Sequence, residues 1–273
     1  MTPFTDLRRL SLNQATTQRW SLREAVEGCA RAGIPAISIW RDKAAELGLP
    51  ASARLVRDAG LSVSSVCRGG WFGATTEAER LARLDDNRRA LDEAAALGTD
   101  TLVVVCGPAP NRDLDGARAW VEEALARLLP DAEAAGVRLA VEPLHPMFTA
   151  DRSVIVSLGQ ANDLVERLAS PWVGVTVDAY HVWWDPRVYH EIERAAGRIL
   201  GFHVSDWLVP TPDILLGRGM MGDGVIELRR LRVAVDAIGY DGFIEVEIFN
   251  QALWDTPGDE ALALMARRYL EHV

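Results

Sequence analysis

Short apolar segments and helical stretches alternate eight times along this chain, and this alternation restricts the fold more than any other feature of the sequence. The apolar segments, rich in valine, isoleucine and leucine, are residues 10–14, 36–40, 61–67, 101–107, 137–143, 173–181, 199–207 and 242–249. The stretches between them have the apolar spacing of amphipathic helices. Strands that are apolar on both faces and alternate with helices are typical of a parallel sheet covered by helices.

Eight strand–helix units in a chain of 273 residues predict a (β/α)8 TIM barrel, with a single domain over residues 1–273. A doubly wound open sheet is the alternative, but no GxGxxG or Walker glycine pattern follows an early strand. Ser21 followed by Glu24 predicts a capping box at the start of the first helix. Pro130 predicts an interruption or a kink in the helical stretch of residues 115–135.

Composition and charge argue against several classes of protein. The net charge of −10 argues against a nucleic-acid partner, since such proteins need Lys and Arg to neutralise phosphates. Three widely spaced cysteines without a CxxC pair indicate a reduced chain rather than a disulfide framework. No apolar run reaches the roughly 18 residues of a membrane span, and the N-terminus has no apolar targeting core. We therefore expect a cytoplasmic protein without a membrane partner.

Four acidic or histidine side chains lie at the ends of the last four predicted strands: Glu142, Asp178, His203 and Glu247. Alone, such a carboxylate is commonly a helix cap and such a histidine a hydrogen-bonded core residue. Barrel enzymes, however, place their chemistry at the C-terminal ends of the strands, and four such groups on adjacent strands would need a cation to neutralise them. The mixed oxygen and nitrogen set predicts one divalent metal ion, with Mn²⁺ expected and Mg²⁺, Co²⁺ or Zn²⁺ as the alternatives.

Polar and aromatic residues just beyond the strands are candidates for substrate contacts. His145 and His181 follow two of the predicted ligands by three residues each, and the alternative for both is an ordinary loop histidine. Trp71 and Trp183 are among several aromatic residues predicted to line a pocket, the alternative being loop packing or a subunit interface. No convincing cluster of basic side chains indicates a phosphate site, which favours an unphosphorylated substrate.

Weaker candidates for polar substrate contacts are Asn13, Arg41 and Arg68, near the ends of the first three predicted strands. Two glutamates in the stretch GFIEVEIFN point to the same side of the last strand, toward the barrel interior. Glu247 lies nearer the mouth, whereas Glu245 lies one layer deeper, where a buried charge needs a partner. We predict Arg138, on the fifth strand, as that partner.

The stretches VEPLHP, VDAYH, GFHVSDW, GRGMMGDG and GYDGFIEVEIFN together resemble the sugar phosphate isomerase/epimerase family of xylose isomerase-like TIM barrels. Ketose 3-epimerases, inosose isomerases and dehydratases, hydroxypyruvate isomerase and the related endonuclease IV belong to this group. The resemblance implies that the four residues above hold the metal ion. It further implies that His181 contacts substrate and that Arg218 bonds a substrate hydroxyl.

The resemblance implies a metal-dependent isomerase or epimerase of a sugar, keto-polyol or inosose, and the family's members are commonly homo-dimers or homo-tetramers. Glu142 and Glu247 would act as acid and base through a metal-stabilised enediolate. A hydro-lyase of the inosose dehydratase type uses the same ligands and is the nearest alternative. An endonuclease IV-like DNA repair hydrolase would need more than the five histidines present. A non-catalytic sugar-binding barrel is the remaining alternative.

Overall fold

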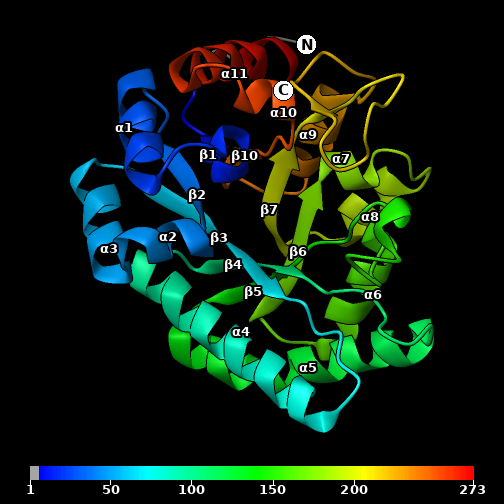
Figure 1. Cartoon of the computed structure of the whole chain (residues 1–273). Helices are drawn as coiled ribbons and strands as arrows, with labels where there is room; N and C mark the ends of the chain where they lie inside the picture. The colour runs from blue at the N-terminus through cyan, green and yellow to red at the C-terminus, as the bar shows by residue number, and fades with distance from the viewer. Residues whose placement is uncertain (1–5) are drawn as a thin grey trace.

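Eight parallel strands close into a barrel with the helices around its outside (Figure 1). The computed structural model describes residues 6–273. The barrel strands are β1 (Leu10–Asn13), β2 (Ala36–Trp40), β3 (Ser62–Gly70), β4 (Thr101–Val105), β5 (Arg138–Val141), β6 (Val173–Asp178), β7 (Ile199–Val204) and β10 (Ile244–Val246). They follow one another around the barrel in the order β1-β10-β7-β6-β5-β4-β3-β2. The predicted (β/α)8 barrel is confirmed, and each predicted segment overlaps one barrel strand, with β3 running three residues past its segment.

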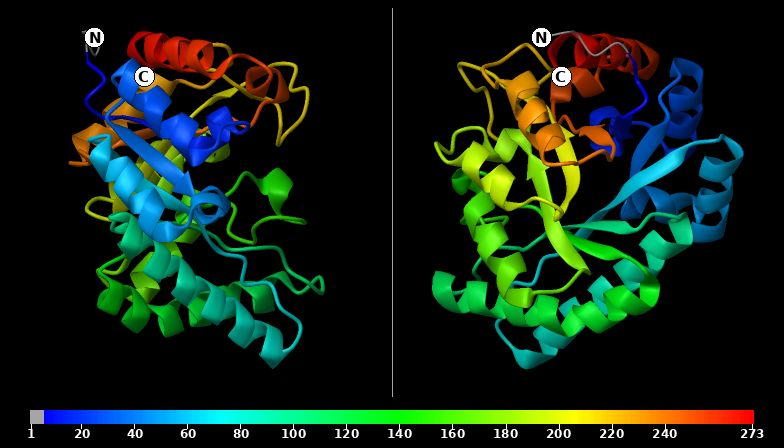
Figure 2. Two further views of the ribbon diagram at one scale, coloured as in Figure 1. Left: turned by 60° about the vertical axis from the view of Figure 1, so that its left-hand side comes forward. Right: turned by 180° about the vertical axis from the view of Figure 1, so that it is seen from behind.

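The helices form the outer layer of the molecule, as the views from the side and from behind also show (Figure 2). They are α1 (Leu22–Ala32), α2 (Arg41–Leu47), α3 (Leu49–Asp58), α4 (Glu77–Leu97), α5 (Leu114–Ala135), α6 (Leu158–Leu168), α7 (Ala179–Val182), α8 (Val188–Arg194), α9 (Leu228–Ala237), α10 (Gln251–Trp254) and α11 (Gly258–His272), with 3-10 turns η1 (Gln14–Thr17) and η2 (Pro146–Phe148). The two longest, α4 and α5, pack side by side, and α11 packs against α1 near the start of the chain. Within residues 6–273, none of the helices combines the length and the hydrophobicity that crossing a membrane requires.

Two local predictions about the helices have different outcomes. The capping box of Ser21 and Glu24 is present at the start of α1 and is confirmed. Pro130, in contrast, lies inside α5, which continues to Ala135, so the predicted interruption is wrong. Pro130 and Ala126, whose carbonyl loses its usual helical donor, are both exposed. Water can therefore satisfy that carbonyl, and the helix tolerates the proline.

The C-terminal ends of β6 and β7 differ from the prediction in a way that shapes the site. Strand β6 stops at Asp178, whose Oδ1 accepts the Tyr180 N–H (2.8 Å) and so caps the one-turn helix α7. Strand β7 stops at Val204, after which β8 (Asp206–Trp207) pairs antiparallel with β9 (Arg218–Gly219). This small second sheet brings Arg218 from a long loop to the mouth of the barrel.

Candidate metal centre

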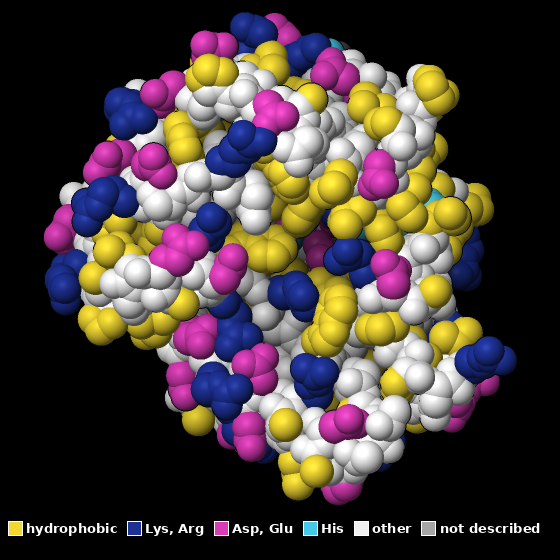
Figure 3. Space-filling view, in the orientation of Figure 1, with side chains coloured by type: hydrophobic (Ala, Val, Ile, Leu, Met, Phe, Trp, Pro, Cys, Tyr) yellow, Lys and Arg dark blue, Asp and Glu magenta, His cyan; other side chains and the backbone are white. Residues whose placement is uncertain are grey.

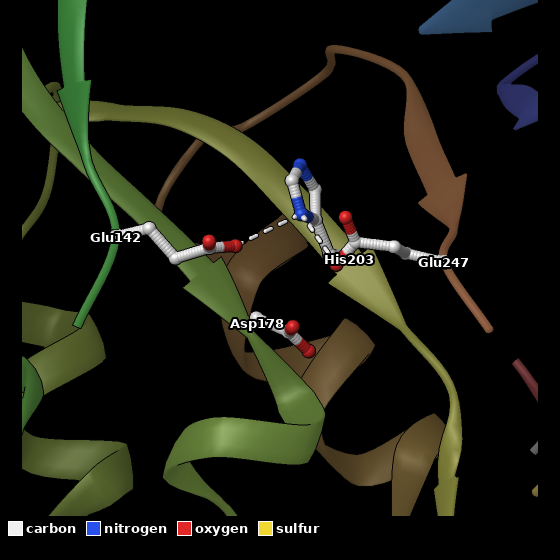
Figure 4. A group of neighbouring side chains, drawn as sticks. All are labelled: Glu142, Asp178, His203 and Glu247. Carbon is white, nitrogen blue, oxygen red and sulfur yellow. Dashed lines mark ion pairs between the residues drawn. The ribbon is translucent and has the colours of Figure 1, made fainter. Parts of the chain in front are cut away.

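Four buried side chains from four adjacent barrel strands meet at the C-terminal end of the barrel. They are the four ligands predicted from the sequence, Glu142, Asp178, His203 and Glu247, drawn in Figure 4. One ligand atom from each lies within 4.8 Å of the others. Strand register explains the convergence, because Asp178 pairs directly with His203 across β6 and β7. All four residues are at most 5% exposed.

The spacing of these atoms fits a divalent cation. Glu142 Oε1 and His203 Nδ1 lie 3.1 Å apart, and in the described part of the chain neither atom has a hydrogen-bond partner. Two ligand atoms at right angles about an ion, each about 2.1 Å from it, are about 3.0 Å apart. Three carboxylates and one imidazole are a donor set that Mn²⁺, Mg²⁺, Co²⁺ or Zn²⁺ can accept.

The pKa values of the two glutamates of this centre are shifted in opposite directions. Burial raises the pKa of Glu142 to about 7, and the charge of Glu247 adds to this rise while His203 opposes it. Burial also acts to raise the pKa of Glu247, but Arg218 and His203 together outweigh it and lower that pKa. Glu142 therefore has a pKa near neutral pH, whereas Glu247 stays ionised. Two carboxyl groups whose pKa values are separated in this way are typical of the acid and the base of one site.

The pKa values of Asp178 and His203 are also raised in this cluster of carboxylates. Burial raises the pKa of Asp178, which Arg218 opposes. Burial acts to lower the pKa of His203, but Glu245 and the ligand carboxylates outweigh it and raise that pKa well above its usual value. A proton on His203 therefore neutralises part of the carboxylate charge, which is the role that a bound divalent ion would take over.

Arg218 lies directly against the ligand cluster, as a substrate-contacting residue would. Its Nη1 donates to Asp178 Oδ2 (3.0 Å) and to Glu247 Oε2 (3.1 Å). Its guanidinium carbon lies 4.6 Å from the Tyr180 ring centroid and 5.0 Å from that of Phe249. The side chain is only 4% exposed, so its charge is held in one place at the base of the cavity.

His181 lies between the loop after β5 and the ligand cluster. The backbone N–H of His145 donates to its Nδ1 (3.1 Å), and Arg218 Nη2 lies 3.1 Å from its Nε2. Burial, followed by the charge of Arg218, lowers the pKa of His181 well below its usual value. Its Nε2 also lies 3.5 Å from Asp178 Oδ2, so the ring is held directly beside a predicted metal ligand.

The partner of Glu245 differs from the prediction. Arg138 is the first residue of β5 and reaches outward to Asp100, at 2.5 Å, so the predicted pair of Glu245 and Arg138 is wrong. Glu245 Oε2 instead lies 3.2 Å from His203 Nε2 and accepts from Asn13 Nδ2 at 3.2 Å. Glu245 holds the ring of His203 from below while Nδ1 faces the ligand cluster, an arrangement common among metal-ligating histidines.

A cavity of about 300 Å³ opens above the ligands, within the range of small-molecule sites. Its charged lining residues are Arg68, Glu142, Arg152, Arg218 and Glu247. Its aromatic lining residues are Trp40, Trp71, Phe148, His181, Phe249 and Trp254. The hollow at the middle of the face in Figure 3 has acidic atoms at its bottom and Lys or Arg side chains at its edge.

The structure separates the predicted substrate residues into two groups. Trp71, His181 and Arg218 line the cavity. His145 and Trp183 are outside that lining and pack against Trp207, with ring centroids 4.8 and 5.7 Å away. His145 acts on the site through its backbone bond to His181. Contact of any of these side chains with substrate stays a prediction.

The weaker polar candidates also divide. Arg41 is bound by Asp86 and Glu93 and is thereby neutralised. Asn13 is fully buried below the cavity, where its Nδ2 donates a hydrogen bond to Glu245. Arg68 lines the cavity.

Sequence reasoning missed Arg152, Phe148, Phe249 and Trp254 as cavity residues. Arg152 and Phe148 lie in or beside the connection between η2 and α6, and the other two follow β10. The signal that identifies them is position alone, since loops after barrel strands form the active-site face.

A family model described as xylose isomerase-like TIM barrel matches residues 26–271. Among solved structures, protein SMc04130 from Sinorhizobium meliloti 1021 is 48% identical with a TM-score of 0.96, over 98% of this chain and 99% of that chain. An IolI protein described as having a binding zinc atom has a TM-score of 0.86 over 97% of this chain and 98% of that chain. Its identity is only 21%, so this likeness shows the fold alone.

Curated relatives match at lower identity. A 3-dehydroshikimate dehydratase of Pseudomonas aeruginosa is 28% identical over 87% of this chain and 37% of its own length. An inosose isomerase of Halalkalibacterium halodurans is 27% identical over 50% of this chain and 49% of its own length. The chain thus spans about half or less of the length of these relatives.

Proposed function

The chain belongs to the xylose isomerase-like TIM barrel family, and we propose that it is a divalent-metal-dependent isomerase or epimerase of a small polyhydroxy carbonyl compound. One observation carries this proposal: two glutamates, an aspartate and a histidine, all buried, converge within 4.8 Å at the base of a cavity. A bound divalent ion would supply Lewis-acid stabilisation of the negative charge that develops on adjacent substrate oxygens in an enediolate. We propose Mn²⁺ as that ion.

Proton transfer is assigned to the two glutamates of the centre. Glu142 follows β5 and Glu247 follows β10, and strands β6 and β7 lie between them in the barrel order. Carboxylates that reach the cavity from two sides can remove a proton α to a carbonyl on one face and return it on the other. Return to the other face of the same carbon gives an epimer, and return to the neighbouring carbon gives an isomer.

Two further side chains hold the substrate in this scheme. His181, which lines the cavity beside Asp178, contacts a substrate oxygen. Arg218 binds a hydroxyl oxygen while its contacts with Asp178 and Glu247 fix its position. The aromatic lining covers the apolar face of the substrate and excludes water from the enediolate.

A dehydratase is the second candidate, and the extent of the sequence matches favours it. The dehydratase relative matches 87% of this chain, whereas the inosose isomerase matches 50%. The same α-proton abstraction by a glutamate leads to a dehydratase product when a β-hydroxyl then leaves.

Incubation of the Mn²⁺-loaded protein with ketoses, inososes and 3-dehydroshikimate in D₂O, followed by NMR, tests both candidates. Deuterium at the α-carbon with an epimer or isomer supports the first, and loss of water with a new double bond supports the second. Glu247→Gln should abolish exchange, while Glu260→Gln, at an exposed position on α11, should not. Exchange that persists in Glu247→Gln, or none with any compound when Mn²⁺ is bound, would refute the proposal.

A further inference from the structure

Three arginines line the cavity, and they differ in how their charges are satisfied. Arg218 donates to two ligand carboxylates at 3.0 and 3.1 Å. Arg68, near the end of β3, has no carboxylate within ion-pair distance in the described part of the chain. Arg152 reaches only its neighbour Asp151, with Nε 3.7 Å from Oδ2, and this buried Nε has no hydrogen-bond partner among residues 6–273. Two guanidinium groups of the cavity therefore lack full partners.

The guanidinium of Arg68 is held in a fixed position. Its central carbon lies 4.2 Å from the ring centroid of Trp71. Trp71 adopts a left-handed backbone conformation (φ 57°), and its N–H donates to Val105 O at 2.7 Å. The buried amide of Asn87 binds both the N–H and the carbonyl of Gly70, which fixes the preceding peptide. A guanidinium stacked in this way keeps its in-plane N–H groups free to bind a planar oxyanion.

The positive charges of this part of the cavity act on one another. Burial lowers the pKa of Arg68, and the charges of Arg152 and Arg41 add to this effect. Arg41 is already neutralised by Asp86 and Glu93, so its charge is not available to a ligand. Arg68 remains without a carboxylate partner in the described part of the chain, and Arg152 has only the 3.7 Å contact with the exposed carboxylate of Asp151.

The charges of the ligand cluster do not neutralise Arg68 and Arg152. With a divalent ion bound as the proposed function requires, the ion and Arg218 together balance the three ligand carboxylates. The carboxylate of Glu245 lies deeper, on His203 and Asn13. The outer cavity then carries the positive charges of Arg68 and Arg152, beside aromatic walls, where an anionic group would be strongly bound.

We infer that Arg68 and Arg152 bind a carboxylate group of the substrate, which is therefore an acidic keto-polyol rather than a neutral sugar. This inference rests on the proposed function for the carbonyl end, which lies at the metal centre, but its anion site uses residues separate from the metal ligands. Each guanidinium fork matches the two oxygens of a carboxylate. A carboxylate is smaller than a phosphate ester, and a cavity of about 300 Å³ lies at the lower end of the usual range.

Calorimetric titration of the Mn²⁺-loaded protein with shikimate, a cyclic polyol carboxylate, and with its uncharged methyl ester measures the inferred preference. Wild-type protein should bind shikimate at least about ten-fold more tightly than the ester, as expected for a lost charge-assisted contact. Arg68→Gln and Arg152→Gln should each remove most of that preference. Arg54→Gln, which removes an exposed charge from α3 far from the cavity lining, should retain it.

Equal binding of shikimate and its ester by wild-type protein would overturn the inference, as would an unchanged preference in both cavity variants. Tighter binding of inorganic phosphate than of shikimate would overturn the assignment to a carboxylate. Mn²⁺ titration of every variant separates this result from the proposed function. Absence of Mn²⁺ binding in the wild type refutes the metal centre, whereas intact Mn²⁺ binding without charge preference refutes the anion site alone. Arg152→Gln, in a loop, keeps the test informative if Arg68→Gln fails to fold.

Discussion

Replacement of Glu245 gives the sharpest test of how the candidate metal centre is built. Its side chain is 3% exposed, accepts a hydrogen bond from Asn13 Nδ2 at 3.2 Å, and lies 3.2 Å from His203 Nε2 as an ion pair. Glu245→Ala leaves both buried side chains without this carboxylate. Hydrogen bonds to charged groups contribute about 1.5–3 kcal/mol each, and loss of one partner of a buried ion pair costs about 3–5 kcal/mol. We expect the free energy of unfolding to fall by about 3–5 kcal/mol.

Glu245→Gln separates stability from metal binding. The amide oxygen of glutamine can still accept the hydrogen bond from Asn13, so the loss of stability should be smaller, about 1–2 kcal/mol. The negative charge on the Nε2 side of His203 is lost, which makes Nδ1 a poorer ligand. Replacement of such a supporting residue typically weakens metal affinity by about 10–100-fold. Mn²⁺ titration by calorimetry should show this weakening, while urea unfolding of the metal-free protein measures stability.

Arg138→Gln is the matched control, since the sequence alone predicts Arg138 as the partner of Glu245. The side chains of Arg138 and Asp100 are 36% and 60% exposed, and exposed ion pairs contribute about 0–1 kcal/mol. The unfolding midpoint and the Mn²⁺ affinity of the Arg138→Gln variant should therefore stay close to those of the wild type. An Arg138→Gln variant as unstable as Glu245→Ala, or a Glu245→Gln variant with unchanged Mn²⁺ affinity, would refute the reasoning.

Three other expectations follow from the same geometry. Chelation of bound metal with EDTA should lower the melting temperature, since a ligand present at about 100 times its Kd stabilises the native state by about 2.7 kcal/mol; an unchanged value would contradict the metal centre. Asn87→Ala should lower the free energy of unfolding by about 2–4 kcal/mol in urea, because it removes both bonds to the buried Gly70 peptide; a change under 0.5 kcal/mol would contradict this. Gly70→Ala should reduce soluble yield far more than Gly98→Ala. A Cβ at residue 70 would lie 2.1 Å from Val105 O, whereas a Cβ at residue 98 would meet nothing within 4 Å. Equal yields of the two variants would contradict this expectation.

The strands and the convergence of the four candidate metal ligands were predictable because both depend on regular geometry. Strands buried on two faces appear in sequence as apolar runs between helical stretches. The ends of such strands meet at one rim, so a ligand-type residue near each of the last four ends has a fixed position. Glu142 and Glu247 could therefore be brought together from sequence although 105 positions separate them along the chain.

The partner of Glu245 was not predictable, because alternation gives the face of a strand but not its height in the barrel. Arg138 occupies the first position of β5, at the rim opposite the candidate metal centre, and turns toward Asp100. Glu245 is level with His203 in the register of β10 and β7. Height depends on the stagger between neighbouring strands, which the sequence of one strand does not contain.

The substrate pocket was the least predictable part, and its arginines show why. Arg68 was a weak candidate and Arg152 was not one, because the first lies near the end of a strand and the second lies in a loop without periodicity. The sequence shows no basic cluster because its arginines are not neighbours along the chain. In the folded barrel, loops after different strands share one rim, so residues 84 positions apart line one cavity. Charge at such a site is decided by which arginines already have carboxylate partners. Arg41 has them and Arg68 does not, a difference that only the packing of α4 against the barrel reveals.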